Sequence, residues 1–220
     1  MTEANQPIAL WASDGNPLAE DFTGPFGAPP FGSIRPEHFP PGFERAFAAH
    51  DAEVAAIAAD PADPTFDNTI VALELAGRAL GRVSDLFGLL AGAHTNDALL
   101  AIEREISPRR ARHWNGILLN EPLFRRIDAL YQRRGTLGLG AEQERALERY
   151  SLMFRRAGAG LDPAAKKRLA EISERLATLG TAFSQNVLAD ERDYALVLES
   201  EEDCAGLPDF VLAAARTAAG

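Results

Sequence analysis

Apolar residues recur every three or four positions from residue 37 onward, a spacing that places them on one face of an α-helix. The first stripe comprises Phe39, Phe43, Phe47, His50, Val54 and Ile57. The pairs Asp60-Pro61 and Asp63-Pro64 end this helix, because a residue before proline avoids the helical conformation. A second helix begins after Thr65, a favourable N-cap residue. Its stripe comprises Phe66, Ile70, Leu73, Leu80, Val83, Phe87 and Leu90.

Further helix starts are marked by Asn96, Asn120 and Asp162, each of which suits the N-cap position before an apolar repeat. Pro108 falls inside the helix that follows Asn96. It predicts a kink or a restart, because proline removes a backbone donor. The helix after Asp162-Pro163 is the longest in the chain. Its stripe comprises Leu169, Ile172, Leu176, Leu179, Phe183 and Val187.

Two glycines, Gly77 and Gly81, lie on or near the apolar face of the second helix. A glycine inside a helix costs about 1 kcal/mol relative to alanine. We therefore attribute both glycines to the close approach of a neighbouring helix.

The two ends of the chain depart from the helical pattern. Residues 1–35 are rich in proline, glycine, asparagine and aspartate, and they predict an irregular arm that its phenylalanines pin to a surface. Residues 194–198 predict a short strand-like or extended segment, and a last helix follows over 210–219. We therefore predict an all-α, multi-helix bundle over 36–190, followed by a separate segment over 191–220.

Composition and charge narrow the classes of function. The net charge of −10, from 22 basic and 32 acidic residues, opposes non-specific binding to nucleic acid. No stretch approaches the ~20 apolar residues of a membrane-spanning helix, and the first residues lack the apolar run of a signal peptide. The single cysteine, Cys204, favours a reducing compartment. We therefore expect a cytoplasmic protein without a nucleic-acid or membrane partner.

Residue types that perform catalysis are present, but not in catalytic patterns. The histidines are His38, His50, His94 and His113; no two lie four residues apart, and no His-Glu-x-x-His sequence occurs. There is no Gly-x-Ser-x-Gly elbow, and acidic neighbours of Cys204 oppose thiolate formation. We therefore predict no catalytic and no metal-ligating residue in this chain. For His50, on the apolar stripe, we predict a hydrogen-bonded core or boundary position.

A resemblance to a known family rests on stretches that occur in the expected order. They are residues 16–39, rich in proline and glycine, Thr-Phe-Asp-Asn-Thr at 65–69, Ala-His-Thr-Asn at 93–96, and residues 179–190. Together they resemble the N-terminal region of the thimet-oligopeptidase family. Within that family they resemble the branch of oligopeptidase A and peptidyl-dipeptidase (dipeptidyl carboxypeptidase).

The resemblance implies a function for the chain. In that family two helical halves flank a narrow channel, and the zinc ligands and general base lie in the second half. This chain would then be the N-terminal, substrate-channel-forming domain of a zinc-dependent oligopeptidase that hydrolyses short peptides. Its partner would be a C-terminal catalytic domain beyond residue 220, reached through residues 191–220. Zinc would belong to the full-length enzyme, and this chain alone would be inactive.

Two polar segments are candidates for the channel wall. One contains His94 and Asn96, and the other contains Gln185 and Asn186. The simpler interpretation is structural, with Asn96 as a helix cap and the second segment tied to neighbouring helices or to the catalytic domain beyond this chain. The functional interpretation is that His94 and Asn96 belong to a polar patch facing the peptide channel. Gln185 and Asn186 would contact the backbone of the substrate.

Two alternatives to the peptidase domain remain at this point. One is a stand-alone helical module that binds a peptide or a protein without catalysis, and the other is a purely structural bundle. A sizeable exposed apolar surface is expected where a catalytic half would dock.

Overall fold

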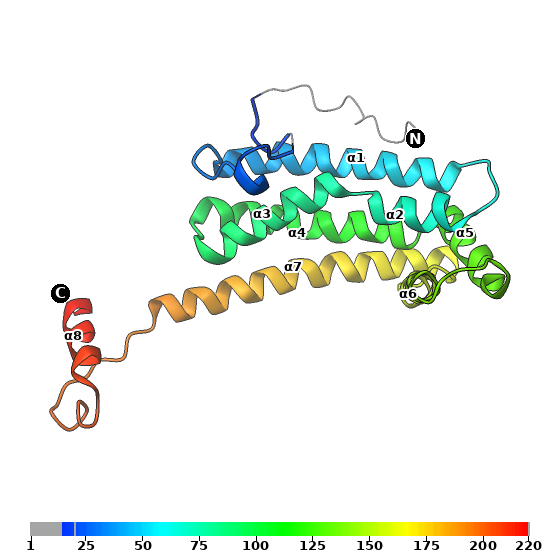
Figure 1. Cartoon of the computed structure of the whole chain (residues 1–220). Helices are drawn as coiled ribbons and strands as arrows, with labels where there is room; N and C mark the ends of the chain where they lie inside the picture. The colour runs from blue at the N-terminus through cyan, green and yellow to red at the C-terminus, as the bar shows by residue number, and fades with distance from the viewer. Residues whose placement is uncertain (1–14, 20, 220) are drawn as a thin grey trace. The chain divides into compact units, whose positions relative to one another are not determined.

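The computed structural model describes residues 15–19 and 21–219, which fall into two compact units, one ending at Ala182 and the other beginning at Phe183 (Figure 1). The helices are α1 (Phe39–Ala59), α2 (Ala72–Leu75), α3 (Arg78–Ala93), α4 (Asp97–Leu118), α5 (Glu121–Gln132), α6 (Ala141–Arg156), α7 (Pro163–Asp193) and α8 (Asp209–Ala218). Shorter turns are η1 (Pro25–Gly27), η2 (Pro36–His38), η3 (Phe66–Val71) and η4 (Arg134–Thr136). The described ranges contain no strand, so the predicted all-α class is confirmed. None of their helices is long and apolar enough to span a bilayer.

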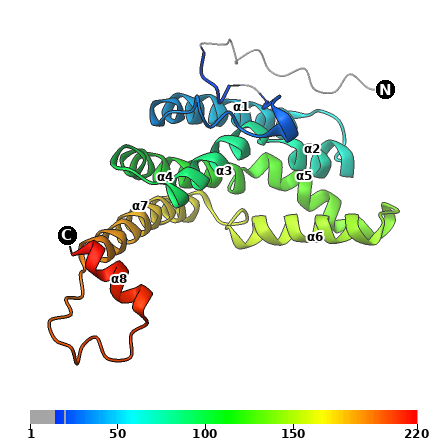
Figure 2. The ribbon, with the colours of Figure 1, turned by 60° about the vertical axis from the view of Figure 1, so that its left-hand side comes forward.

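Helix α1 is shared by two hydrophobic cores of the first unit. It packs against α3, α4 and α5, and Figures 1 and 2 show α1 running beside α3 and α4. The first core comprises Leu18, Ile34, Phe39, Phe43, Ala46, Phe47, Leu80, Val83, Leu86, Phe87, Leu99 and Ile106. The second core comprises Val54, Ile57, Ile70, Ile117, Leu123, Ile127, Leu130, Leu147, Phe154 and Ala159.

The described part of the N-terminal arm is irregular and held to the bundle; residues 1–14 of the predicted arm lie outside the described residues. Leu18 is fully buried and rests on Gly42, where an added Cβ would lie 3.1 Å from its Cδ1. The Asn16 side chain donates a hydrogen bond to the carbonyl oxygen of His38 at 2.9 Å. Leu18 and the Asn16 amide therefore help to hold the arm over the start of α1, together with Ile34, which is buried in the first core.

The second predicted helix is not continuous, which corrects the sequence prediction. It begins as the π-helical turn η3, passes into α2 and breaks at Gly77, whose φ of 75° is left-handed. A Cβ on Gly77 would lie 2.8 Å from Cε1 of His50, so close approach does explain this glycine. The same explanation is wrong for Gly81, because an added Cβ there would meet no described atom within 4 Å.

Two other sequence predictions each offered two alternatives, and the structure rules out one of each, the restart at Pro108 and the strand over 194–198. Helix α4 continues through Pro108, so no restart occurs; burial of Ile106 and Ile117 on either side favours the helix despite the lost backbone donor. Residues 194–199 have no regular secondary structure. A strand needs a pairing neighbour for its backbone, and the described part of the chain supplies none.

Candidate functional site

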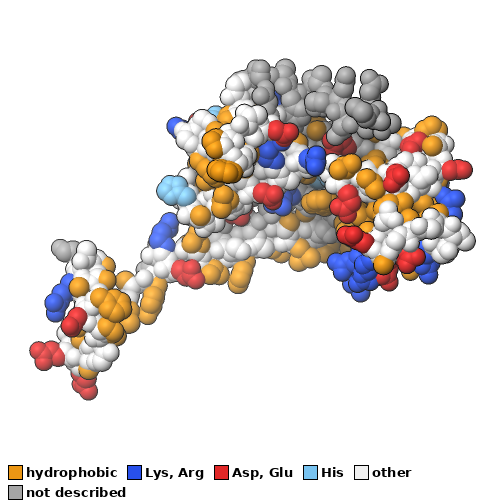
Figure 3. All heavy atoms as spheres, in the orientation of Figure 1, with side chains coloured by type: hydrophobic (Ala, Val, Ile, Leu, Met, Phe, Trp, Pro, Cys, Tyr) orange, Lys and Arg blue, Asp and Glu red, His pale blue; other side chains and the backbone are white. Residues whose placement is uncertain are grey.

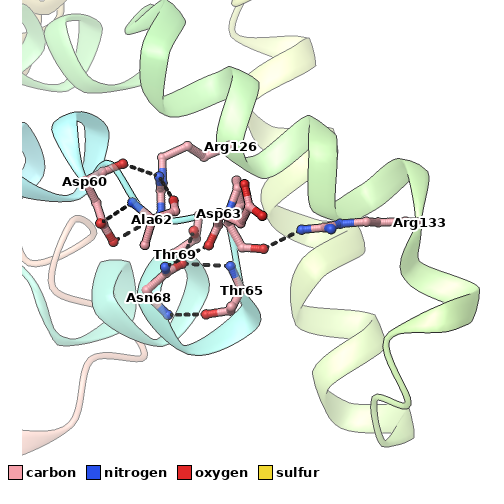
Figure 4. A network of polar contacts seen from close by, with 9 residues as sticks. Asp60, Ala62, Asp63, Thr65, Asn68, Thr69, Arg126 and Arg133 are labelled. Carbon is pink, nitrogen blue, oxygen red and sulfur yellow. Dashed lines mark hydrogen bonds and ion pairs between the residues drawn. The ribbon is translucent and has the colours of Figure 1, made fainter.

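The loop between α1 and η3 is closed by a buried arginine (Figure 4). Arg126 of α5 is 7% exposed, and its Nη1 donates to the carbonyl oxygens of Asp60 at 2.7 Å and Ala62 at 3.0 Å. Its Nη2 donates to Oδ2 of Asp60 at 3.3 Å. Arg133, at the end of α5, donates to the carbonyl oxygen of Pro64. Two arginines of α5 therefore supply hydrogen-bond donors to backbone carbonyl oxygens of a proline-rich loop.

The Thr-Phe-Asp-Asn-Thr segment at 65–69 has its polar atoms engaged in the same loop. Thr65 accepts from the Asn68 amide at 3.0 Å, and Asn68 Oδ1 accepts from the Thr65 amide at 2.7 Å, a capping box that confirms the predicted N-cap (Figure 4). Asn68 Nδ2 also donates to the carbonyl oxygen of Asp63 at 3.0 Å. The segment that carries part of the family resemblance thus has a structural role here.

A pair of buried histidines joins α1 to α4. His50 and His113 are 5% and 8% exposed, and His50 Nδ1 lies 2.9 Å from His113 Nε2. His113 Nδ1 lies 3.1 Å from Oδ1 of Asp51, whose side chain is largely exposed. The rings of Phe47 and Trp114 pack against the pair, with centroids 5.0 Å from His113 and 5.7 Å from His50. The predicted hydrogen-bonded core position of His50 is confirmed.

Burial sets the protonation of this pair. It lowers the pKa of His50 from 6.5 to about 4, His113 lowers the pKa further, and Asp51 opposes the shift. Burial also lowers the pKa of His113, against the attraction and hydrogen bond of Asp51. His113 was missed as a core residue, although it lies seven residues after Ile106 and four before Ile117 on one face of α4.

The first pair of predicted channel residues lies at the turn between α3 and α4. His94 is exposed and ends α3, where its amide donates to the carbonyl oxygen of Leu90 at 2.9 Å. Asn96 is the N-cap of α4, and its Oδ1 accepts from the Leu99 amide at 3.0 Å. The structural role predicted for Asn96 is confirmed, and its contact with a substrate stays a prediction.

The second pair of predicted channel residues lies on α7. Gln185 is half-buried and Asn186 is exposed. Both belong to the second unit, whereas His94 and Asn96 belong to the first. Whether the four side chains share one channel therefore stays a prediction.

One face of α7 carries the contacts with α4. Arg112 donates from Nε and Nη2 to the two carboxylate oxygens of Glu174 at 3.2 and 2.9 Å. Ser107 and Asn115 donate to the carbonyl oxygens of Ala177 and Ala170 at 3.4 and 3.3 Å. These contacts are polar, and none of the described side chains of α7 is buried.

The opposite face of α7 is apolar and exposed. At about 100° per residue, the positions facing α4 and the predicted apolar stripe point in roughly opposite directions around the helix. The exposed members of this stripe are Ile172 at 39%, Leu176 at 62%, Leu179 at 47%, Phe183 at 70% and Val187 at 39%. Figure 3 shows hydrophobic side chains projecting along the lower edge of α7. We name these five residues the α7 stripe; Ile172, Leu176 and Leu179 belong to the first unit, and Phe183 and Val187 belong to the second. Their exposure agrees with the expected exposed apolar surface, and docking of a catalytic half on it stays a prediction.

The described residues offer no constellation for a metal ion. No group of three histidine, cysteine, aspartate or glutamate side chains converges within the described ranges. In the histidine pair, the two facing nitrogens are occupied by their mutual contact. These residues therefore do not fit a catalytic zinc ion, and no chemical step is assigned to them.

Comparison with known proteins defines the class of the chain. No protein-family model matches it. It is 39% identical over 204 residues to the dipeptidyl carboxypeptidase of Escherichia coli (strain K12), a match covering 93% of this chain and 30% of that protein. It is 28% identical over 204 residues to oligopeptidase A of Salmonella typhimurium, covering 93% of this chain and 29% of that protein. The chain is thus a helical relative of peptidases.

The family resemblance inferred from the sequence is confirmed. The homologues of this chain over nine-tenths of its length are dipeptidyl carboxypeptidase and oligopeptidase A. Oligopeptidase A of Escherichia coli (strain K12) is 27% identical over 195 residues, which is 89% of this chain and 29% of that protein. The chain spans about 30% of the length of the relatives it matches.

Proposed function

We propose that this chain is the N-terminal, substrate-channel-forming part of a zinc-dependent oligopeptidase that hydrolyses short peptides. The observation that carries the proposal is the match to dipeptidyl carboxypeptidase. The identity of 39% extends over 93% of this chain but covers only 30% of that peptidase. High coverage of this chain and low coverage of the peptidase are expected if this chain is a helical part of a larger peptidase.

The α7 stripe supports the same proposal. Its side chains form an apolar row on a helix that is otherwise held by polar contacts with α4. Rows of exposed apolar side chains of this kind mark protein–protein contact surfaces. The partner that the stripe would contact is the rest of the peptidase, beyond the part that this chain matches.

In this proposal the catalytic groups lie outside the chain. Zinc and its ligands would be held by the catalytic half, because the described residues do not fit the ion. His94, Asn96, Gln185 and Asn186 would face the peptide channel as polar side chains. The enzyme would act in the cytoplasm, and this chain alone would hydrolyse nothing.

The proposal is tested first at the gene and then in the assay. Reading the gene beyond codon 220 is expected to reveal an in-frame continuation with His-Glu-x-x-His. The purified 220-residue chain is expected to release no product from short fluorogenic peptides and to hold no stoichiometric zinc by elemental analysis. Adding the separately expressed continuation with zinc is expected to produce hydrolysis.

Two results would contradict the proposal. One is a stop codon directly after codon 220. The other is peptide hydrolysis by the purified chain that persists after exhaustive chelation and is absent from a mock purification.

A further inference from the structure

The histidine pair lies where three elements of the first unit meet. His50 comes from α1, His113 comes from α4, and the ring of His50 presses on Gly77, the break between α2 and α3. Glu53 of α1 accepts a hydrogen bond from the Gly77 amide at 2.7 Å. The pair therefore links α1 to α4 and, through Gly77, to the turn that separates α2 from α3.

The geometry limits how many protons the pair can bind. With both rings neutral, His113 donates from Nδ1 to Asp51, and its Nε2 accepts from Nδ1 of His50. One added proton is tolerated, because it makes His113 a donor from both nitrogens while His50 becomes the acceptor. A second added proton would put hydrogens on both facing nitrogens, which are only 2.9 Å apart.

We propose that His50 and His113 form an acid-sensitive latch: the pair holds α1, α4 and the Gly77 turn together, and its second added proton separates the rings and opens this junction. The opening is local. Trp114 is 45% exposed in the closed junction and covers both rings, with centroids 5.7 Å from His50 and 6.0 Å from His113. Opening gives water access to the part of the indole that faces the histidines.

The charged groups around the latch influence the pH at which it opens. From α1, Asp51 stabilises the first proton on His113, and Glu53 is bound to the Gly77 amide. From α4, Arg109 lies over the Phe47 ring at 5.7 Å and pairs with Glu44 of α1. The α2–α3 break presents the backbone of Gly77 to the His50 ring. Asp51 is therefore the charged group in direct contact with the pair.

The direction of the pH effect follows from burial. Burial lowers the pKa of His50 to about 4 in the closed junction, whereas a solvated imidazole has its ordinary value of 6.5. Between these pH values the opened junction binds more protons than the closed one, so the closed state loses stability as the pH falls. The closed state therefore has its full stability above pH 6.5 and loses it progressively as the pH falls toward 4.

The test follows Trp114 in the chain with Trp11→Phe, which leaves one tryptophan. The emission maximum is recorded from pH 7.5 to pH 3.5, with helicity measured by circular dichroism in the same samples. A red shift with a midpoint between 4 and 6.5, at unchanged helicity, is expected. No red shift, or a loss of helicity with the same midpoint, overturns the proposal.

Three variants test whether the red shift of Trp114 emission depends on the histidine pair. Asp51→Asn removes the group that stabilises the first proton in the closed state, so the midpoint should move toward neutral pH by about half a unit or more. Asp85→Asn, an exposed aspartate on α3, is the matched control and should leave the midpoint unchanged. His50→Asn keeps a donor and an acceptor for His113 without titrating, and it should abolish the transition. Equal midpoints in Asp51→Asn and Asp85→Asn overturn the latch, even if His50→Asn fails to fold.

Discussion

At the scale of single residues, a few buried polar side chains join elements of the first unit, alongside its two apolar cores. Sequence reasoning found His50 because it interrupts an apolar stripe, and a polar side chain there needs a hydrogen-bond partner. It did not find Arg126, which lies between the core residues Leu123 and Ile127. The partners of Arg126 are backbone carbonyls from a distant loop, and no local pattern indicates such contacts.

The loop between α1 and η3 should depend on Arg126. Arg126→Ala leaves the carbonyl oxygens of Asp60 and Ala62 without their donor, and we expect the free energy of unfolding to fall by about 2–4 kcal/mol. The measurement is chemical denaturation followed by circular dichroism. Arg125→Ala is the matched control: its side chain is exposed and pairs with Glu121 on the helix surface, so no measurable change is expected. Equal effects of the two changes would contradict this role of Arg126.

At the scale of helices, caps were predictable and breaks were not. Thr65, Asn96 and Asn120 cap their helices as predicted, because an N-cap depends on residues within one turn. The break at Gly77 depends on the ring of His50, which belongs to another helix. A glycine in the sequence shows that a backbone can bend; the contact that requires the bend comes from the tertiary structure.

Substitution of Gly77 and Gly81 should distinguish a glycine that a tertiary contact requires from one that no contact requires. Gly77→Ala adds a Cβ at a left-handed φ of 75° and against the buried His50 ring, so the free energy of unfolding should fall by about 2–4 kcal/mol. A Cβ added at Gly81 faces open space, so Gly81→Ala, inside α3, should raise the free energy of unfolding by up to about 1 kcal/mol. Urea titration of both variants measures the difference. A Gly77→Ala chain as stable as the parent would show that the break is not required.

At the scale of the whole molecule, the sequence predicted the class of fold, the apolar repeat along α7 and an exposed apolar surface, but not that the repeat is exposed or which surfaces act together. The stripe was visible as a repeat along α7, and its exposure follows because α4 contacts the opposite face through polar groups. The candidate channel residues are divided between the two compact units. Their grouping into a site depends on the proposed catalytic half, which no local pattern in this chain describes.

The α7 stripe should matter for assembly and not for the stability of this chain. Leu176→Lys replaces a side chain that is 62% exposed, so the thermal midpoint should stay unchanged while affinity for the separately expressed catalytic half falls about tenfold or more. Leu89→Lys on α3, where the leucine is 53% exposed, is the control and should retain the affinity. Calorimetric titration gives both values. If both lysine variants bind as the parent chain does, the stripe is not the contact surface.

The histidine pair also has a consequence for how α1 and α4 find their alignment. His50 lies between Phe47 of the first core and Val54 of the second, and His113 lies in the same way between Ile106 and Ile117. A polar layer thus interrupts an otherwise apolar seam. Sliding α1 by one turn along α4 would bury two unpaired imidazoles, which adds the cost of desolvating unpaired polar groups. The His50–His113 contact, together with the pairs of Asp51 with His113 and of Glu44 with Arg109, therefore favours one register of the two helices, as a single buried asparagine does in coiled coils.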